Sequence, residues 1–499
     1  MTGASEELAP RLRDALSTAG FTYDGVAEAL GPSAHAALSR NETLPGLRAT
    51  LGGSPVESLT RLWLLQTVVP VEAVEGALPG LLDPLCAAGF LERSVGEVRA
   101  ALDVRPYAAD DRDLWVTSDL TPGLDGAPMR VSTDHVLGVS SASTSLAQLA
   151  VRAPVGRALD LGSGCGVQAL HLAAHTKRVV ATDLNPRAVW LTRFNCALNG
   201  LAQQVEVREG SLFEPVAGER FDLVVTNPPF VISPGTGERL VYRDSGLPGD
   251  RVVEDIVRAC PRFLREGGIA QVLANWVIRR DEPWEERLAD WVVGCDAWVV
   301  QREVVDLPTY VELWLKDEGA HGGPDYHRRY DTWLSWFEDQ GVESVGFGWV
   351  SLRLAGDGSV PPVLRTEDWS YDVEQPVGPE VAAYFARVAG LRELTDVDLS
   401  ALRLVARSDL RQETYGAPGA ADPAEIVLRQ QRWMRRARQV DTVAAALVGA
   451  CDGELSVAEI LAALGQLLEQ EAGQLRTTYL PVVRDLVAEG FLELPPPLV

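Results

Sequence analysis

Near the middle of the chain stands the segment Leu159-Asp160-Leu161-Gly162-Ser163-Gly164-Cys165-Gly166. It closes a short apolar run and opens a helical pattern, so we expect a strand, a sharp turn and a helix in succession. Glycines suit such a turn because the backbone must bend sharply and a ligand must approach without a Cβ in the way. The spacing of Gly162, Gly164 and Gly166 differs from the GxGxxG of nicotinamide enzymes, which admits a pyrophosphate beside the helix. The turn therefore predicts a cofactor that has no pyrophosphate.

A strand that ends in an acidic residue follows, in Val179-Val180-Ala181-Thr182-Asp183-Leu184-Asn185-Pro186. Asp183 stands about twenty residues beyond the first glycine, as expected in a nucleoside-binding unit, and its carboxylate can accept hydrogen bonds from both ribose hydroxyls. Taken alone, Asp160 or Asp183 could be an ordinary carboxylate at a strand-end turn. Because the two elements end successive strands, we interpret them together as a site for S-adenosylmethionine. The residues expected to contact it are Gly162, Gly164, Gly166, Asp183 and Leu184.

Outward from these elements, short β-branched runs alternate with amphipathic helical patterns, which is typical of a parallel sheet covered by helices. Strands are expected at Arg157–Asp160, Arg178–Asp183, Val205–Arg208, Phe221–Thr226, Ile269–Ala274, Ala297–Glu303 and Phe347–Leu354. Seven strands with the last two closing antiparallel match the methyltransferase form of the α/β, Rossmann-like sheet. Between the last two we expect a helical insert at about 309–341, whose Trp314, Trp333 and Trp336 are interpreted as packing on the core.

The fourth expected strand ends in the most informative stretch, Phe221-Asp222-Leu223-Val224-Val225-Thr226-Asn227-Pro228-Pro229-Phe230. Its two prolines leave the carbonyls of Asn227 and Pro228 free of ladder hydrogen bonds. If the Asn227 side-chain oxygen and the Pro228 carbonyl accept the two N–H bonds of a planar amide or amine, the nitrogen lone pair can be aimed at a sulfonium methyl. Phe230 would stack on the planar group. The stretch therefore predicts Asn227, Pro228 and Phe230 as the catalytic residues of an N-methyltransferase.

The flanking regions have other patterns. We expect a mostly helical N-terminal domain at 1–107, a junction at 108–150 in which Ala108–Arg130 could form a small hairpin, the catalytic core at 151–355 and a C-terminal domain at 356–499. Leu85–Glu92 and Leu486–Glu493 are alike, since in each a helix ends at a glycine suited to a left-handed cap and Phe-Leu-Glu begins a strand. The recognition helix of a winged-helix module runs into its wing in this way, so both domains are interpreted as winged-helix-like. The alternative is a common combination of helix stop and strand start.

The composition excludes several classes of protein. The chain has 499 residues, 46% of them hydrophobic and 23% charged, which is typical of a globular protein of two or three domains. Its formal net charge of -25 would repel a phosphate backbone, so RNA binding needs a local basic patch. The six cysteines have no CxxC or metal-ligand spacing, which predicts reduced thiols, no metal and a cytoplasmic location. No apolar run is long enough to span a bilayer, so no membrane partner is expected.

These motifs together resemble the small-domain (MTS) class I methyltransferases that carry (N/D)PP(Y/F). This superfamily contains the glutamine methyltransferases of release factors, the HemK type, and rRNA and tRNA base methyltransferases. The resemblance covers roughly residues 140–305. After the tetrapeptide, Val231–Pro234, Tyr242–Asp250 and Pro261–Gly268 follow in HemK-like order.

The resemblance implies further contacts with S-adenosylmethionine. Asp160 is expected to face the methionine ammonium, Ser211 and Leu212 the adenine ring, and Thr144 the carboxylate of the cofactor. This chain departs from the family pattern where Ser143 replaces an acidic residue, Ser211 a frequent aspartate, and Phe230 the usual tyrosine. These departures leave the identity of the substrate open.

Three functions are therefore compared. The first is methylation of a protein glutamine side chain, for example in a translation factor, which the HemK-like loop and the acidic surface favour. The second is methylation of an exocyclic amine of adenine or guanine in RNA, with the base stacked on Phe230. The third is a cofactor-binding regulator without turnover, against which the intact Asn227–Phe230 tetrapeptide argues.

One feature favours the RNA hypothesis. Five arginines surround Trp433 on what we expect to be a helix: Arg429, Arg432, Arg435, Arg436 and Arg438. One helix face could follow phosphates while Trp433 stacks on a base. The alternative, which we favour, is that these arginines pair with carboxylates of the protein itself.

Overall fold

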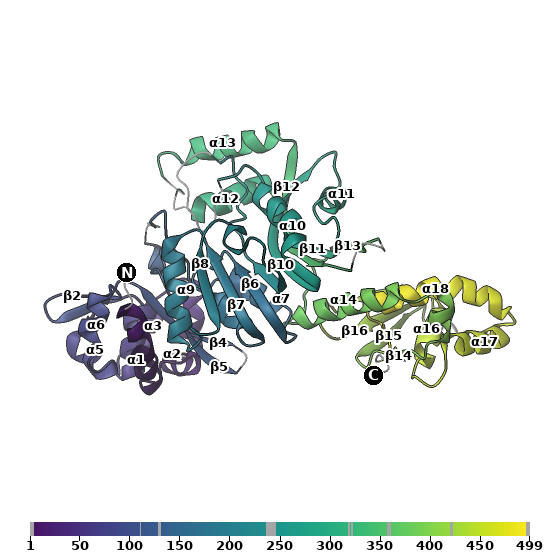
Figure 1. The fold of residues 1–499 in the computed structure, drawn as a ribbon, viewed down its shortest axis with the longest axis horizontal. Helices are drawn as coiled ribbons and strands as arrows, with labels where there is room; N and C mark the ends of the chain where they lie inside the picture. Colours follow the sequence, from purple (N-terminus) through teal and green to yellow (C-terminus); the bar gives the residue numbers. More distant parts are fainter. Residues whose placement is uncertain are drawn as a thin grey trace. The chain divides into compact units, whose positions relative to one another are not determined.

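The computed structural model describes residues 4–109, 111–127, 131–235, 246–317, 320, 323–356, 361–419 and 423–495. The chain forms two compact units, one of residues 1–147 and 154–369 and the other of residues 148–153 and 370–499 (Figure 1).

The first unit is built around an eight-stranded sheet with the order β13-β11-β12-β10-β9-β6-β7-β8. Its strands are β6 (Val155–Leu161), β7 (Thr176–Asp183), β8 (Val205–Glu209), β9 (Phe221–Thr226), β10 (Leu264–Arg279), β11 (Asp296–Asp306), β12 (Val342–Arg353) and β13 (Leu364–Asp368). The pairs β7–β8, β6–β7, β6–β9 and β9–β10 are parallel. The α/β, Rossmann-like prediction is confirmed, and each of the seven expected strands is present.

The last two expected strands, β11 and β12, pair antiparallel as predicted, and β12 also pairs antiparallel with β10. One detail of the sheet differs from the prediction. An eighth strand, β13, pairs in parallel with β11 beyond the boundary expected at residue 355. None of its residues is fully buried, so it lacks the apolar run that marks the inner strands.

Helices connect the strands of the sheet. They are α7 (Ser141–Leu149), α8 (Val167–Leu172), α9 (Pro186–Leu198), α10 (Arg251–Phe263) and α11 (Trp284–Ala289), with short 3-10 turns at Leu124–Gly126 and Glu214–Val216. α9 begins directly after β7, because the Asn185 side chain accepts a hydrogen bond from Arg187 N and Pro186 takes the first helical position. This short connection holds Asp183 at the edge of the sheet where the parallel strands end.

The expected helical insert is present as α12 (Leu307–Asp317) and α13 (Tyr326–Asp339). Trp333 and Phe337 are buried in a cluster that also contains Val231 and Ile232. The insert therefore packs against the segment that directly follows Asn227–Phe230.

The N-terminal part of the first unit shares a core with the sheet domain. Its elements are α1 (Ala4–Thr18), α2 (Tyr23–Leu38), α3 (Leu44–Ala49), α4 (Pro55–Leu59), a π-helical turn (Thr60–Leu64), β1 (Val69–Pro70), α5 (Val71–Ala77), α6 (Leu82–Ala87), β2 (Leu91–Arg93), β3 (Glu97–Ala100), β4 (Asp103–Ala109) and β5 (Arg112–Ser118). β3 lies between β1 and β2, while β4 and β5 form a hairpin. Phe194 and Leu198 of α9 are buried in the same cluster as Leu12, Phe21 and Trp63.

The second unit has a core of its own. Its elements are α14 (Gly378–Arg392), α15 (Asp396–Ala401), β14 (Val405–Ala406), β15 (Leu410–Tyr415), β16 (Glu425–Gln430), β17 (Ala437–Val440), α16 (Thr442–Ala450), α17 (Val457–Leu468), α18 (Ala472–Ala488) and β18 (Leu492–Glu493). β15, β16 and β17 form one small sheet, and β14 pairs with β18. The helix expected around Trp433 is wrong, because the arginine cluster lies on the β16–β17 hairpin. Ile426, Leu428 and Gln430 are buried alternately, which is the two-residue period of a strand.

Candidate active site

A pocket of about 410 Å³ opens where the parallel strands β6, β7 and β9 end. Its volume suits a small-molecule cofactor. The structure brings most of the expected residues together in its lining, namely Gly162, Gly164, Asp183, Leu184, Ser211, Leu212, Asn227 and Pro228.

The glycine turn is tied to the end of β7. Gly162 and Gly164 have φ values of 75° and 56°, which glycine adopts without strain. Gly164 N donates to one carboxylate oxygen of Asp183 over 2.8 Å, and Asn185 N donates to the other over 2.9 Å. Burial raises the pKa of Asp183. Each oxygen keeps a lone pair, so the carboxylate can still accept from ribose hydroxyls.

Leucine side chains at the pocket are unusually exposed. Leu184 is 53% exposed, Leu212 37%, Leu137 39% and Leu247 38%, and all of them line the pocket. Exposed apolar side chains grouped around one opening indicate a binding surface. These leucine side chains form an apolar surface on which a flat ring such as adenine could pack.

Asn227 stands at the end of β9 with an unused acceptor. The Thr226 hydroxyl donates to Leu161 O over 2.7 Å, which joins β9 to β6 directly before the motif. Within the part of the chain that the structure describes, Asn227 Oδ1 is buried and has no hydrogen-bond partner. A buried acceptor left unpaired costs about 1–3 kcal/mol, so a ligand N–H group that reached it would be favoured.

Some expected residues do not line the pocket. Asp160 is 1% exposed and accepts a hydrogen bond from Ala169 N over 2.9 Å, and burial raises its pKa to about 7. Gly166 packs on Thr192, where an added Cβ would lie 3.0 Å from a methyl carbon. The ring of Phe230 lies 6.4 Å from that of Trp314, edge to face. Thr144 is also outside the lining, whereas its neighbour Ser143 is in it.

Residues of the expected junction complete one side of the pocket. His135, Val136 and Ser140 line it, together with Gln168 of α8. Asp119 holds this segment in place, since it accepts from Val136 N over 2.8 Å and pairs with Arg187. Sequence reasoning missed these residues because their polar, turn-rich surroundings carry no periodic pattern. The Tyr242–Ser245 part of the HemK-like loop lies outside the described residues, whereas Leu247 beside it lines the pocket.

Comparison with known proteins identifies the family of the sheet domain. A model described as "Methyltransferase small domain" matches residues 138–297. A release factor glutamine methyltransferase of Cereibacter sphaeroides is 30% identical over 202 residues, which cover 38% of this chain and 68% of that protein. The chain belongs to the class I S-adenosylmethionine-dependent methyltransferases, of the HemK-like small-domain type.

Other relatives of this methyltransferase family match over shorter parts. A ribosomal protein uL3 glutamine methyltransferase of Bradyrhizobium diazoefficiens is 32% identical over 172 residues, 34% of this chain and 49% of that protein. A ribosomal RNA small subunit methyltransferase C of Alcanivorax borkumensis is 32% identical over 135 residues, 27% of this chain and 36% of that protein. The chain thus spans about half or less of the length of these two relatives. Domains of unknown function match residues 18–101 (DUF7059) and 382–494 (DUF7782).

The cysteines of this methyltransferase do not indicate a nucleophile or a metal site within the described residues. Cys165 lines the pocket, but burial raises its pKa to about 12, so it stays a thiol rather than a nucleophile at neutral pH. All six cysteines are free. Among the described residues, no cluster of three or more His, Cys, Asp or Glu side chains could hold a metal ion. In the same residues, no helix has the length and apolar character needed to cross a membrane.

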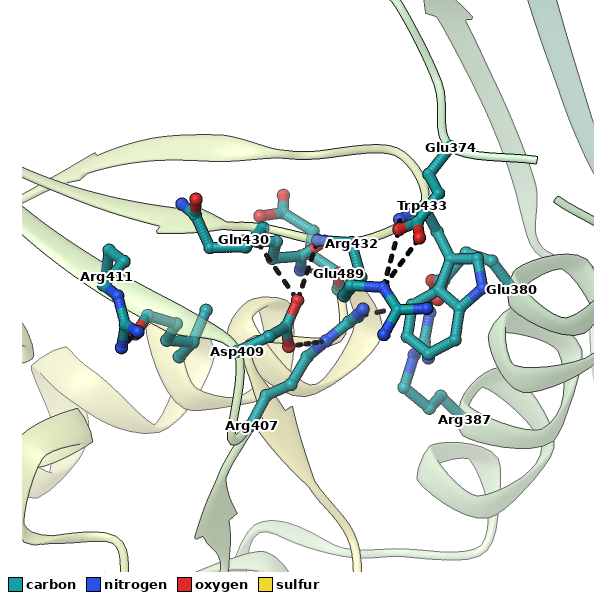
Figure 2. A network of polar contacts seen from close by, with 12 residues as sticks. Glu374, Glu380, Arg387, Arg407, Asp409, Arg411, Gln430, Arg432, Trp433 and Glu489 are labelled. Atoms are coloured by element: carbon teal, nitrogen blue, oxygen red, sulfur yellow. Dashed lines mark hydrogen bonds and ion pairs between the residues drawn. The ribbon is translucent and has the colours of Figure 1, made fainter. Parts of the chain in front are cut away.

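Three of the arginines around Trp433 pair with carboxylates of the second unit, and Figure 2 shows Arg432 with Glu374. Arg432 pairs with Glu374 over 2.7 Å, Arg429 with Glu413 over 2.6 Å, and Arg438 with Glu489 over 3.0 Å. The guanidinium carbons of Arg407 and Arg432 lie 4.5 and 5.5 Å from the Trp433 ring centroid. The ring and three of the five arginines are thus committed within the protein, as the preferred alternative expects.

Proposed function

We propose that the chain is an S-adenosylmethionine-dependent N-methyltransferase that modifies a planar amide nitrogen, most simply that of a protein glutamine side chain. The observation that carries this proposal is the unpaired, buried Oδ1 of Asn227 at a pocket that the glycine turn also lines. An amide N–H2 group supplies the donors that this oxygen lacks.

The described residues fit the cofactor, which supplies a methyl group on a sulfonium sulfur. Asp183, which lines the pocket, would accept hydrogen bonds from the ribose hydroxyls, and the exposed Leu184 and Leu212 would cover the adenine faces. Asp160 and Thr144 lie outside the pocket lining, so their expected contacts with the ammonium and the carboxylate remain predictions.

Asn227 and Pro228 would orient the acceptor nitrogen. Asn227 Oδ1 and the Pro228 carbonyl accept its two N–H bonds, which directs the nitrogen lone pair at the reacting carbon. The proton leaves after methyl transfer, because the methylated nitrogen is acidic, so no strong base is required. Phe230 is half-buried beside Trp314 and is proposed to bound the substrate side of this arrangement.

The choice of a protein substrate rests on the surface of the chain. The net charge is -25, and three of the arginines that could have followed phosphates are paired internally. The glutamine methyltransferases among the relatives support the same choice. A translation factor or ribosomal protein, met in the cytoplasm, is the kind of partner we propose.

The second candidate is an exocyclic amine of adenine or guanine in RNA. One relative is an RNA methyltransferase, and the same pair of acceptors would orient such an amine. The N-terminal elements have the order of a winged-helix module: a helix, a strand, two helices and two strands follow one another, and β3 lies between β1 and β2. This order favours a role of the N-terminal part in recognition of the substrate. We propose that this part is a winged-helix module, a fold that contacts proteins as well as nucleic acids.

Methyl transfer from labelled S-adenosylmethionine into protein and RNA fractions of a cell extract tests the proposal. Label is expected in protein with the wild-type chain and is expected to fall by roughly 100-fold or more with Asn227→Ala, since a lost transition-state contact of this kind costs that much. Label in RNA would support the second candidate, and label in neither fraction a cofactor-binding regulator.

Calorimetry separates binding from catalysis in the same variants. Asn227→Ala should bind S-adenosylmethionine almost as well as the wild-type chain, whereas Asp183→Ala should bind it at least about ten-fold more weakly, because two hydroxyl contacts are lost. Unchanged affinity in Asp183→Ala would contradict the ribose assignment.

A further inference from the structure

Gln168 lies directly behind the glycine turn, as the second residue of α8. It lines the pocket, yet the residue is only 5% exposed. A glutamine buried at this depth must place both an N–H2 donor and a carbonyl acceptor, since either left unpaired is costly.

The donor of this amide has a partner in the protein. Gln168 Nε2 donates to the backbone carbonyl of Ser143 over 2.7 Å. This bond fixes the orientation of the amide, because a flipped group would bring two oxygens together. Ser143 itself is held by Ser140, whose amide donates to the Ser143 hydroxyl over 2.8 Å.

The carbonyl oxygen of the same amide has no such partner among the described residues. Gln168 Oε1 is buried, and among the described residues it meets no hydrogen-bond donor. The two carboxylates near the turn differ from it in this respect, since Asp160 accepts from Ala169 N and Asp183 from Gly164 N and Asn185 N. Gln168 therefore carries an uncommitted acceptor on a side chain that belongs to a lining residue of the pocket.

We infer that Gln168 Oε1 accepts a hydrogen bond from the ammonium group of the amino-acid end of S-adenosylmethionine. The inference rests on the proposed function and adds a binding residue to it. An ammonium group carries three N–H donors and needs neutral or anionic acceptors when it leaves water. Gln168 offers one, and its bond to Ser143 holds that acceptor in place.

The test compares two ligands that differ in the amino-acid group and in the charge on sulfur, which is a sulfonium in S-adenosylmethionine and a neutral thioether in 5′-methylthioadenosine. S-Adenosylmethionine carries the amino-acid group, whereas 5′-methylthioadenosine lacks it and keeps the adenine and ribose. Gln168→Met fills a similar volume without an acceptor. Calorimetry should show a loss of roughly ten-fold or more in affinity for S-adenosylmethionine, as for a hydrogen bond to a charged group, and a change of at most about two-fold for 5′-methylthioadenosine.

Two further variants keep the test decisive. Gln168→Glu restores an acceptor but loses the donor to Ser143 O, so it should bind both ligands more weakly, while its preference for S-adenosylmethionine over 5′-methylthioadenosine should return toward that of the wild-type chain. Ser140→Ala disturbs the same loop while leaving Gln168 in place, so it should change the affinity for both ligands alike.

Equal losses for both ligands in Gln168→Met would overturn the inference, because they would mean that Gln168 only holds the Ser143 loop. No loss for either ligand would also overturn it. A wild-type chain that binds neither ligand would contradict the proposed function itself, which separates the two failures.

Discussion

The carboxyl of Asp160 is buried, lies outside the pocket lining and accepts a hydrogen bond from Ala169 N of α8. Burial is the main cause of its raised pKa, about 7 against an ordinary 3.8, and the nearby Asp183 carboxylate adds to it. Between these two pH values the folded chain holds a proton that the unfolded chain releases. The contribution of Asp160 to the free energy of unfolding therefore falls as pH rises from about 4 to about 7 and is then constant.

Asp160→Asn should remove this loss. An asparagine oxygen can still accept the hydrogen bond from Ala169 N, while no charge has to be buried. In thermal unfolding without cofactor at pH 8, we expect Asp160→Asn to have a higher Tm than the wild-type chain, which corresponds to a gain of up to a few kcal/mol in the free energy of unfolding. At pH 4 we expect little difference between the two chains. A difference that is the same at both pH values would show that Asp160 does not titrate in this range.

At the scale of elements, the α12–α13 insert is bonded to the loop that follows Asn227–Phe230. The buried Tyr310 hydroxyl accepts a hydrogen bond from Ile232 N over 2.8 Å. The Tyr310 ring also lies 6.1 Å from that of Trp314, the tryptophan that contacts Phe230. The insert thus holds the segment that directly follows Asn227–Phe230.

Tyr310→Phe should therefore lower kcat without changing cofactor binding. The Ile232 N–H group would lose its acceptor, and a small shift of the loop could cost roughly 10–100-fold in kcat. The Kd for S-adenosylmethionine should stay within about two-fold, because the glycine turn and Asp183 are untouched. Tyr330→Phe is the matched control, since it removes a hydroxyl that bonds Glu312 on the exposed face of the same insert. An unchanged kcat in Tyr310→Phe would contradict a positioning role.

Elements with a strong local pattern could be predicted from the sequence. The inner strands are apolar runs buried on both faces of the sheet, as in β9, where five of six residues are buried. The glycine turn and Asp183 also carry local signals, because turn geometry and strand-end position restrict the residue type. Gln168 and Tyr310 could not be predicted, since their roles depend on contacts with residues far away in the chain.

The hairpin around Trp433 shows how two patterns can compete. Arginines spaced by three and four residues suggested one face of a helix, while the apolar residues alternate with a period of two. Trp433 and Arg435 have positive φ values of 51° and 52°, which a helix interior does not allow. The buried apolar period was the better guide here, because charged residues can pair with carboxylates on either type of element.

At the scale of the whole molecule, the N-terminal region belongs structurally to the catalytic unit. Trp115 Nε1 donates to Phe21 O over 2.7 Å, and the buried Asn195 of α9 exchanges hydrogen bonds with both backbone groups of Thr117. The Asn195 side chain also donates to Cys165 O in the glycine turn over 2.7 Å. The β4–β5 hairpin and the cofactor turn are therefore joined through one side chain.

The two ends of the chain should respond differently to removal. Every residue that lines the pocket lies between His135 and Ile256, within the first unit. A chain ending at Trp369 should thus fold and bind S-adenosylmethionine within about three-fold of the full chain, less than 1 kcal/mol. Removal of residues 1–101 should instead cause unfolding, because it exposes Phe194 and Leu198, each worth about 1.5–3 kcal/mol when buried. Circular dichroism and calorimetry on both truncated chains check this. If the chain ending at Trp369 lost its affinity for the cofactor, the second unit would have to take part in forming the site, and the division into a catalytic unit and a separate C-terminal unit would be wrong.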